Sequence, residues 1–303
     1  MKIFRQLLLW SVIFGAFCLL FYICSPEEQP HPTPSGDEKT VLLLRNNDVV
    51  SIPLRDYLIG AVAGEMPVSF GEEALKAQAV AIRSYLLATK RHENASICDD
   101  SRCCLAYKDL SLLQEFWGAD YEENLAHVSA AVDATSGSYL IYRDEPVQAV
   151  FHASSGGATE DSAALWGALP YLVSVSTPET TATVDNLVSY VYVSPEEMAA
   201  ILSLPADNDP SLWIQDIRHS DSGRVKGIYI GDKAFTGPYI RSAFGLRSTD
   251  FALEWDGEGF LFTVTGHGHG VGMSQYGAML LAAEGYTYRD ILAHYYPQTQ
   301  LVA

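Results

Sequence analysis

Residues 61–92 constrain the fold of this chain more than any other stretch, because a proline divides two segments with different structural preferences. A small apolar run ends in the sequence GEMP, and a helix is predicted over about residues 72–90. Pro67 disfavours helical geometry at Met66 and has no backbone N–H to donate. Glu65 is therefore predicted to lie at or beside a break in the chain.

Glu65 has two interpretations on the residues alone. A carboxylate at a chain break can point into a cleft, next to a helix that carries Gln78 and Arg83. A lone general acid would be built in this way. The alternative is a solvated loop glutamate, which is the commoner position of any single Glu.

Composition limits the classes of partner. A chain of 303 residues with 48% hydrophobic content can bury one large core or two smaller ones. Its net charge of −18 argues against nucleic acid as a partner, because nucleic acid favours basic surfaces.

The N-terminus has the pattern of a membrane anchor. Lys2 and Arg5 precede residues 6–24, a run of 19 residues without a charge. Such a run is long enough to cross a hydrocarbon core of ~30 Å, and the basic flank places the N-terminus in the cytoplasm. A cleaved signal peptide is the alternative, but the run ends without a small-x-small cleavage site. We expect an anchor over residues 1–24, a proline-rich linker over 25–39 and one extracytoplasmic domain over 40–303.

The pattern of strands and helices predicts an α+β fold. Hairpins are expected to pair residues 40–44 with 49–54, 138–142 with 147–152, and 224–230 with 233–235. Single strands are expected at 188–193 and 260–265. Helices are expected from residue 56, over 122–135, after a capping box formed by Ser194 and Glu197, and twice near the C-terminus. Hairpins mixed with helices, without βαβ alternation, indicate α+β.

Four soft metal ligands lie within 13 residues: His92, Cys98, Cys103 and Cys104. Three thiols and an imidazole can complete a tetrahedral zinc site, which would be closed and structural. The alternative is a Cys98–Cys104 disulfide, which an oxidising compartment favours and which leaves Cys103 unpaired.

Four segments resemble, in order, the stage II sporulation protein D family, the lytic transglycosylases of spore formation. They read GEMPVSFGEEALKAQAVAIRSY (64–85), FHASSGGATE (151–160), GPYIRSAFGLRST (237–249) and GHGVGMSQYGAMLLAAEGYTYRDILAHYY (268–296). The resemblance covers about residues 40–303. It implies cleavage of the bond between N-acetylmuramic acid and N-acetylglucosamine in peptidoglycan, without water. One residue acts first as acid and then as base, so a single Glu is sufficient.

The resemblance also implies roles for individual residues. Glu65 falls on the family's catalytic glutamate, and Arg83 on an arginine of the adjoining helix that would bind the sugar. The polar residues expected to line the glycan groove are His152, Ser154, Ser155, Gln275 and Tyr276. Tyr171 is a weaker candidate, with a half-buried core tyrosine as the alternative. Some members carry a comparable zinc loop, His-x(5)-Cys-x(4)-His-Cys, in which Cys103 here replaces the second histidine.

The implied role is engulfment of the forespore by the mother cell. The implied location is the mother-cell membrane, crossed once, with the domain facing the wall. Expected partners are glycan strands, the cell-wall amidase that strips stem peptides, and membrane proteins of engulfment. The alternative is a non-catalytic glycan-binding module, as in proteins described as amidase enhancers. A zinc-dependent hydrolase is excluded because no open three-ligand site is present.

Overall fold

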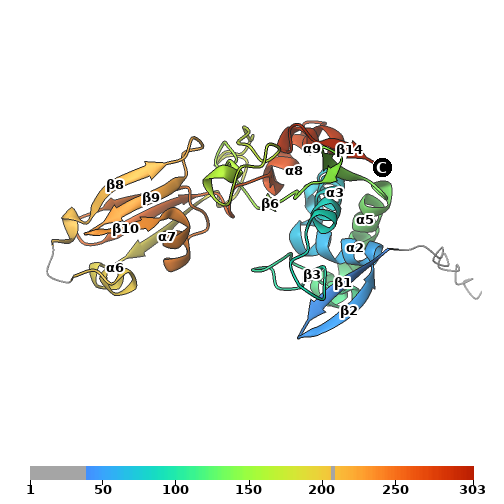
Figure 1. Ribbon diagram of the computed structural model, residues 1–303, viewed down its shortest axis with the longest axis horizontal. Helices are drawn as coiled ribbons and strands as arrows, with labels where there is room; N and C mark the ends of the chain where they lie inside the picture. The colour runs from blue at the N-terminus through green and yellow to red at the C-terminus, as the bar shows by residue number, and fades with distance from the viewer. Residues whose placement is uncertain (1–38, 206–208) are drawn as a thin grey trace, which may run out of the picture. The chain divides into compact units, whose positions relative to one another are not determined.

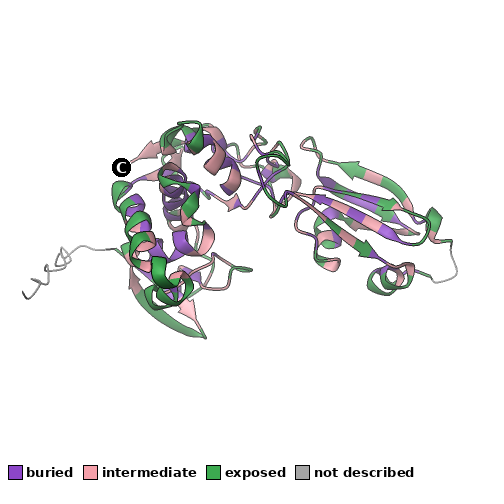
Figure 2. Cartoon of the chain, turned by 180° about the vertical axis from the view of Figure 1, so that it is seen from behind, coloured by how far each residue is buried: buried purple, intermediate pink, exposed green. Residues whose placement is uncertain are grey.

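Two hydrophobic cores organise the chain, one rich in helices and one built on sheets (Figures 1 and 2). The computed structural model describes residues 39–205 and 209–303, which belong to one compact unit, Lys39–Ala303. Helices combined with small, mostly antiparallel sheets confirm the α+β class. The predicted anchor lies outside the described residues. Within them, no helix has both the length and the apolar character that a membrane crossing needs.

The first core surrounds α3 (Glu72–Ala88), the helix predicted after the proline break. Eleven of its residues are buried, so it is covered on nearly every side rather than along one stripe. The packed neighbours are α2 (Leu54–Glu65), α5 (Tyr121–Ala134), α8 (Gln275–Ala283) and α9 (Tyr288–Tyr295). Helices from both ends of the described chain, blue and red in Figure 1, thus complete a single core.

The first predicted hairpin is confirmed and borders this core. β1 (Thr40–Arg45) pairs with β2 (Asp48–Pro53) around Asn46 and Asn47. Both asparagines have positive φ, of 50° and 69°, as a two-residue hairpin turn requires. β3 (Ile97–Cys98) lies parallel to β1 on its other edge.

The second hairpin is shorter than predicted. β4 (Tyr139–Tyr142) pairs with only two residues, β5 (Glu145–Pro146), and with β14 (Gln300–Val302) on its other edge. The prediction that residues 147–152 continue this hairpin is wrong. Pro146 has no N–H for the ladder, and one further bond, from the Val147 N–H to the Leu140 carbonyl oxygen over 3.1 Å, ends the pairing. Instead, β6 (Phe151–His152) pairs in parallel with β13 (Met273–Ser274).

The second core lies within residues 193–264, between β6 and β13 in the sequence. One of its sheets has the order β11-β12-β7 and the other β10-β9-β8. The strands are β7 (Val188–Val193), β8 (Ile214–His219), β9 (Val225–Ile230), β10 (Lys233–Thr236), β11 (Phe251–Trp255) and β12 (Phe260–Thr265). The helices are α6 (Pro195–Leu202) and α7 (Gly237–Ala243). The predicted capping box of Ser194 and Glu197 is confirmed at α6.

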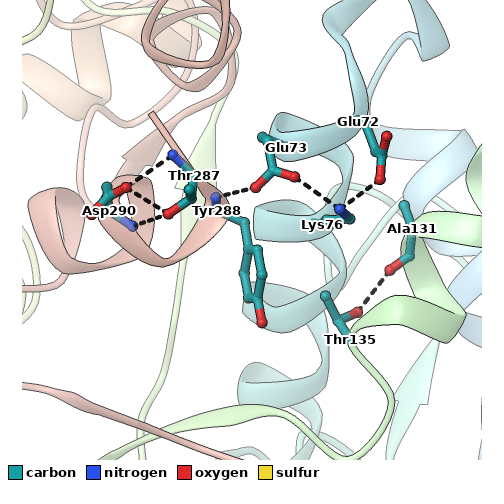
Figure 3. Close-up of polar contacts among 8 residues, drawn as sticks. All are labelled: Glu72, Glu73, Lys76, Ala131, Thr135, Thr287, Tyr288 and Asp290. Atoms are coloured by element: carbon teal, nitrogen blue, oxygen red, sulfur yellow. Dashed lines mark hydrogen bonds and ion pairs between the residues drawn. The ribbon is translucent and has the colours of Figure 1, made fainter. Parts of the chain in front are cut away.

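A charged contact fastens the C-terminal helices to α3 (Figure 3). The Tyr288 N–H, at the start of α9, donates to Glu73 Oε2 over 2.6 Å, and Lys76 Nζ lies 2.8 Å from Glu73 Oε1. Burial alone would raise the pKa of Glu73, but these two bonds outweigh it and lower the pKa. Glu72 also pairs with Lys76, at 2.5 Å, but from the solvent.

We expect Glu73→Ala to lower the free energy of unfolding by about 1–2 kcal/mol, because it leaves the Tyr288 N–H without its acceptor. Glu72→Ala is the matched control and should cost less than about 0.5 kcal/mol, as exposed pairs do. Urea unfolding of the full chain measures both values. The pKa of Glu73 is depressed in the folded state, so its contribution is present above the unfolded pKa and is lost as the pH falls through the folded pKa. Equal losses for the two variants would contradict this role of Glu73.

Candidate active site

Glu65 is the last residue of α2, so the predicted chain break is confirmed. Met66 is extended, with φ −131° and ψ 131°, and Pro67 follows in a similar conformation. The short 3₁₀ helix η1 (Val68–Phe70) then leads into α3. The proline therefore ends the helix directly after the carboxylate.

The half-buried carboxyl group of Glu65 is held by a loop that follows the cysteine cluster. The Ala106 N–H donates to Glu65 Oε1 over 2.5 Å. This approach requires Gly64, because a Cβ at that position would lie 3.0 Å from the Ala106 carbonyl oxygen. From the other side, Gln275 Nε2 donates to the main-chain oxygen of Glu65 over 3.0 Å.

Burial raises the pKa of Glu65 to about 7, and the bond from Ala106 offsets only part of this effect. Among the described residues, no ion pair of Glu65 with a Lys, Arg or His side chain is found. Its acid form is therefore well populated near neutral pH. This is the property that a general acid needs.

Glu65 lies in the wall of a cavity of about 690 Å³, and it is the only carboxylate among the described residues that line it. Arg91 and Arg102 bring positive charge to the wall, and Trp166, 51% exposed, brings an aromatic surface. These residues were not predicted from the sequence. The one signal available in the sequence was Trp166, a tryptophan between the recognisable segments 151–160 and 237–249. No sequence pattern indicated that the backbone of Ala106 would contact Glu65.

His269 is a further cavity residue that the prediction did not include. Burial, with Arg241 and Arg224 nearby, lowers its pKa to about 4, so the ring is neutral near pH 7. Its Nδ1 accepts from the Val271 N–H over 3.0 Å, which leaves the proton on Nε2. The ring is thus a neutral hydrogen-bond donor in the cavity wall.

His152, Ser154 and Ser155 are in the protein interior, with 4%, 2% and 0% exposure, and not in the cavity wall as predicted. His152 Nε2 lies 2.5 Å from Ser155 Oγ, and Arg224 Nη2 donates to the same oxygen over 3.1 Å. Burial lowers the pKa of His152 well below its usual value. These residues join the turn after β6 to the start of β9.

Glu179 holds the same interior region together. Its Oε1 accepts from the Ser155 N–H and from Ser274 Oγ, both over 2.7 Å, and Thr177 donates to Oε2. The carboxylate therefore links the turn after β6 to β13. Within the segment 151–160, Ser155 therefore has a structural role.

The structure shows protein partners for three further predicted residues, Gln275, Tyr276 and Tyr171. Gln275 bonds to the Glu65 carbonyl, as described above, so it positions the site from behind. The ring of Tyr276 packs against Phe70, with centroids 4.7 Å apart. Tyr171 is 7% exposed and its hydroxyl accepts from the Gln148 N–H over 3.3 Å, which favours the core interpretation.

Arg83 is not brought to the cavity. It is 5% exposed, and its Nη1 donates to the Ser138 carbonyl oxygen over 2.8 Å. Burial lowers its pKa to about 10. Arg83 thus supports the turn before β4, and its predicted role in sugar binding has no support in this geometry.

The cysteine cluster is brought together as predicted. The four potential ligand atoms of His92, Cys98, Cys103 and Cys104 lie within 4.8 Å of one another, and the three thiols are free. The Cys103 and Cys104 sulfurs are 3.8 Å apart, and His92 Nε2 is 3.4 Å from Cys104 Sγ. In a tetrahedral zinc site with Zn–S near 2.3 Å, ligand atoms lie ~3.7 Å apart, so the donor set fits zinc.

Comparison with known proteins shows the family of the chain. The profile of the family described as Stage II sporulation protein matches residues 45–142. Stage II sporulation protein D of Bacillus amyloliquefaciens is 40% identical over 83% of this chain and 74% of that protein. The protein of the same name from Bacillus subtilis (strain 168) is 37% identical over 84% of this chain and 76% of its own length. An amidase enhancer of the same strain is 26% identical over 81% of this chain and 40% of that protein. The chain belongs to the stage II sporulation protein D family, a family of sporulation proteins.

Proposed function

We propose that this chain is a peptidoglycan lytic transglycosylase in which Glu65 serves as both acid and base. The observation that carries the proposal is a single carboxyl group, with its pKa raised to about 7, in the wall of a large cavity. A glycosidase of the usual kind needs two carboxylates beside the scissile bond. Among residues 39–205 and 209–303, only Glu65 contributes a carboxylate to this wall.

The reaction has two proton transfers at one residue. Glu65 first donates its proton to the glycosidic oxygen, and the bond from that oxygen to the anomeric carbon breaks. The muramic 6-hydroxyl then attacks the anomeric carbon and gives its proton to the Glu65 carboxylate. The products are a 1,6-anhydro-muramic end and a new N-acetylglucosamine end, and the acid is regenerated. Water is not consumed.

Charge in the cavity favours an acidic polymer despite the net charge of −18. Arg91 and Arg102 are the charged side chains that accompany Glu65 in the wall. Arg102 is paired with Asp100 at 2.9 Å. Arg91 would therefore attract the lactyl carboxylates of muramic acid locally, where the field of the whole chain would repel them. We propose that residues 6–24 anchor the chain in the cell membrane. There it would act on wall glycan during engulfment, with a cell-wall amidase and engulfment membrane proteins as partners.

We also propose that His92, Cys98, Cys103 and Cys104 bind a structural zinc ion. All four ligands come from the protein, so the ion would cross-link the loop and take no part in proton transfer. Cys104 also lines the cavity, and two residues later Ala106 holds Glu65. The site would thus keep in place the loop that orients the acid.

Replacing Glu65 by Gln should abolish release of anhydro-muramic products and leave glycan binding nearly unchanged, because the amide keeps the shape but has no acidic proton. Mass spectrometry of digested glycan measures the products.

The raised pKa means that the Glu65 contribution to stability is lost as the pH rises from 4.5 through about 7. Glu65→Gln lacks this titration and should melt no lower than wild type at pH 8. Undiminished cleavage by the variant would show that Glu65 is not the acid, whereas absence of cleavage by wild type would favour the glycan-binding module.

The rate of cleavage should fall as the pH rises above about 7, because the fraction of protonated Glu65 falls. Well above the pKa the loss approaches about ten-fold per pH unit. The pH profile of kcat/KM for the full chain measures this limb. A rate that stays constant to pH 9 would exclude Glu65 as the acid.

Purified protein should contain about one zinc per chain, and a chelator should lower its melting temperature, because bound metal stabilises the loop. Elemental analysis and thermal unfolding measure the two effects. Cys98→Ser should lose both the metal and the chelator response. Absence of metal together with fewer reactive thiols than cysteines would establish the disulfide instead.

A further inference from the structure

Glu65 also borders a second cavity, of about 460 Å³, and is the only residue that the two cavities share. The second cavity lies between the end of α2, η1, the end of α4 (Leu110–Trp117) and α5. A third cavity, of about 410 Å³, shares Val68, Ser69 and Asn124 with the second. All three volumes are in the range of ligand sites, roughly 300–1,000 Å³. The cavities form a series with the acid between the first and the second.

The second cavity has the chemistry of a sugar subsite. Phe116 is 62% exposed, and Lys108 Nζ lies 4.6 Å from the centre of its ring. Trp117, Ser69 and Asn124 complete the polar and aromatic lining. A pyranose ring has an apolar face of C–H groups and a rim of hydroxyl and amide groups. Aromatic side chains contact such a face, and the Lys, Ser and Asn groups can bond to the rim.

The exposure of Phe116 leaves its ring available to a ligand in the second cavity. It is the only phenylalanine among the strongly exposed large apolar side chains of residues 39–205 and 209–303. Leu112, on the same helix, is 49% exposed but lines none of these cavities. A comparison of Leu112 with Phe116 therefore distinguishes an exposed side chain on α4 outside the cavities from one that lines the second cavity.

We propose that the second cavity binds the N-acetylhexosamine on the opposite side of the scissile bond from the first cavity. This inference rests on the proposed function of Glu65. A strand bound in both cavities extends past the acid in both directions, toward the third cavity on one side. Because the third cavity extends the series beyond the second, the proposal includes cleavage inside glycan strands rather than removal of units from chain ends.

The test compares Phe116→Ala with Leu112→Ala in the full chain. The substrate is peptide-free glycan strands of defined length, labelled at the reducing end. For Phe116→Ala we expect KM on long strands to rise about ten-fold, the effect of losing one aromatic contact, with kcat nearly unchanged. Leu112→Ala should match wild type. Early products of wild type should cover intermediate lengths, and both variants should keep the wild-type melting temperature.

Two results would overturn the inference. If Phe116→Ala has the same KM as Leu112→Ala, the second cavity is not a subsite. If wild type releases only terminal disaccharides from the start, cleavage is not internal. Strand binding in the Glu65→Gln background separates this inference from the proposed function. Weaker binding on adding Phe116→Ala supports the subsite even if wild type shows no cleavage. Unchanged binding refutes the subsite even if wild type cleaves.

Discussion

Burial of α3 on nearly every side is the constraint on which the first core and the candidate site both depend. Three of its buried polar side chains, those of Gln78, Arg83 and Ser84, have hydrogen-bond partners in the interior. Arg83 donates to the Ser138 carbonyl, and Ser84 Oγ accepts from the Leu140 N–H over 2.9 Å. Gln78 accepts from Gln275, the residue that also holds the Glu65 carbonyl. The helix thus fixes the position of Glu65 from inside the core.

Two glutamates on either side of Pro67 show how local surroundings set chemical roles. Glu73 receives bonds from Lys76 and the Tyr288 N–H, so its pKa falls and it serves as a structural anion. Glu65 accepts one hydrogen bond, from the Ala106 N–H, and burial of its carboxyl group outweighs this bond, so its pKa rises. The residue type is the same, but of the two only Glu65 is suited to exchange a proton near neutral pH.

The sequence predicted those features that local rules determine. The break at Pro67, the turn at Asn46 and Asn47, and the capping box of α6 follow from backbone geometry and short-range bonding. The cluster of His92, Cys98, Cys103 and Cys104 was found because soft donors are rare and lie close together in the sequence. The cavity wall was largely missed, because long-range contacts decide which polar residues face it. His152 and Ser155 look like surface polar groups in the sequence, but Glu179 and Arg224, far along the chain, satisfy them in the interior.

The position of the second core between β6 and β13 has a consequence for synthesis on the ribosome. Residues 193–264 contain that core as one continuous segment, so it can form as soon as it emerges. The first core needs α8 and α9, which are made last, and α3 remains partly uncovered until they arrive. Residues 193–264 are therefore able to fold before the first core is complete. During that interval the alanine-rich helix α3 remains partly exposed. Mutations that prevent α8 and α9 from packing would leave the chain in this aggregation-prone state.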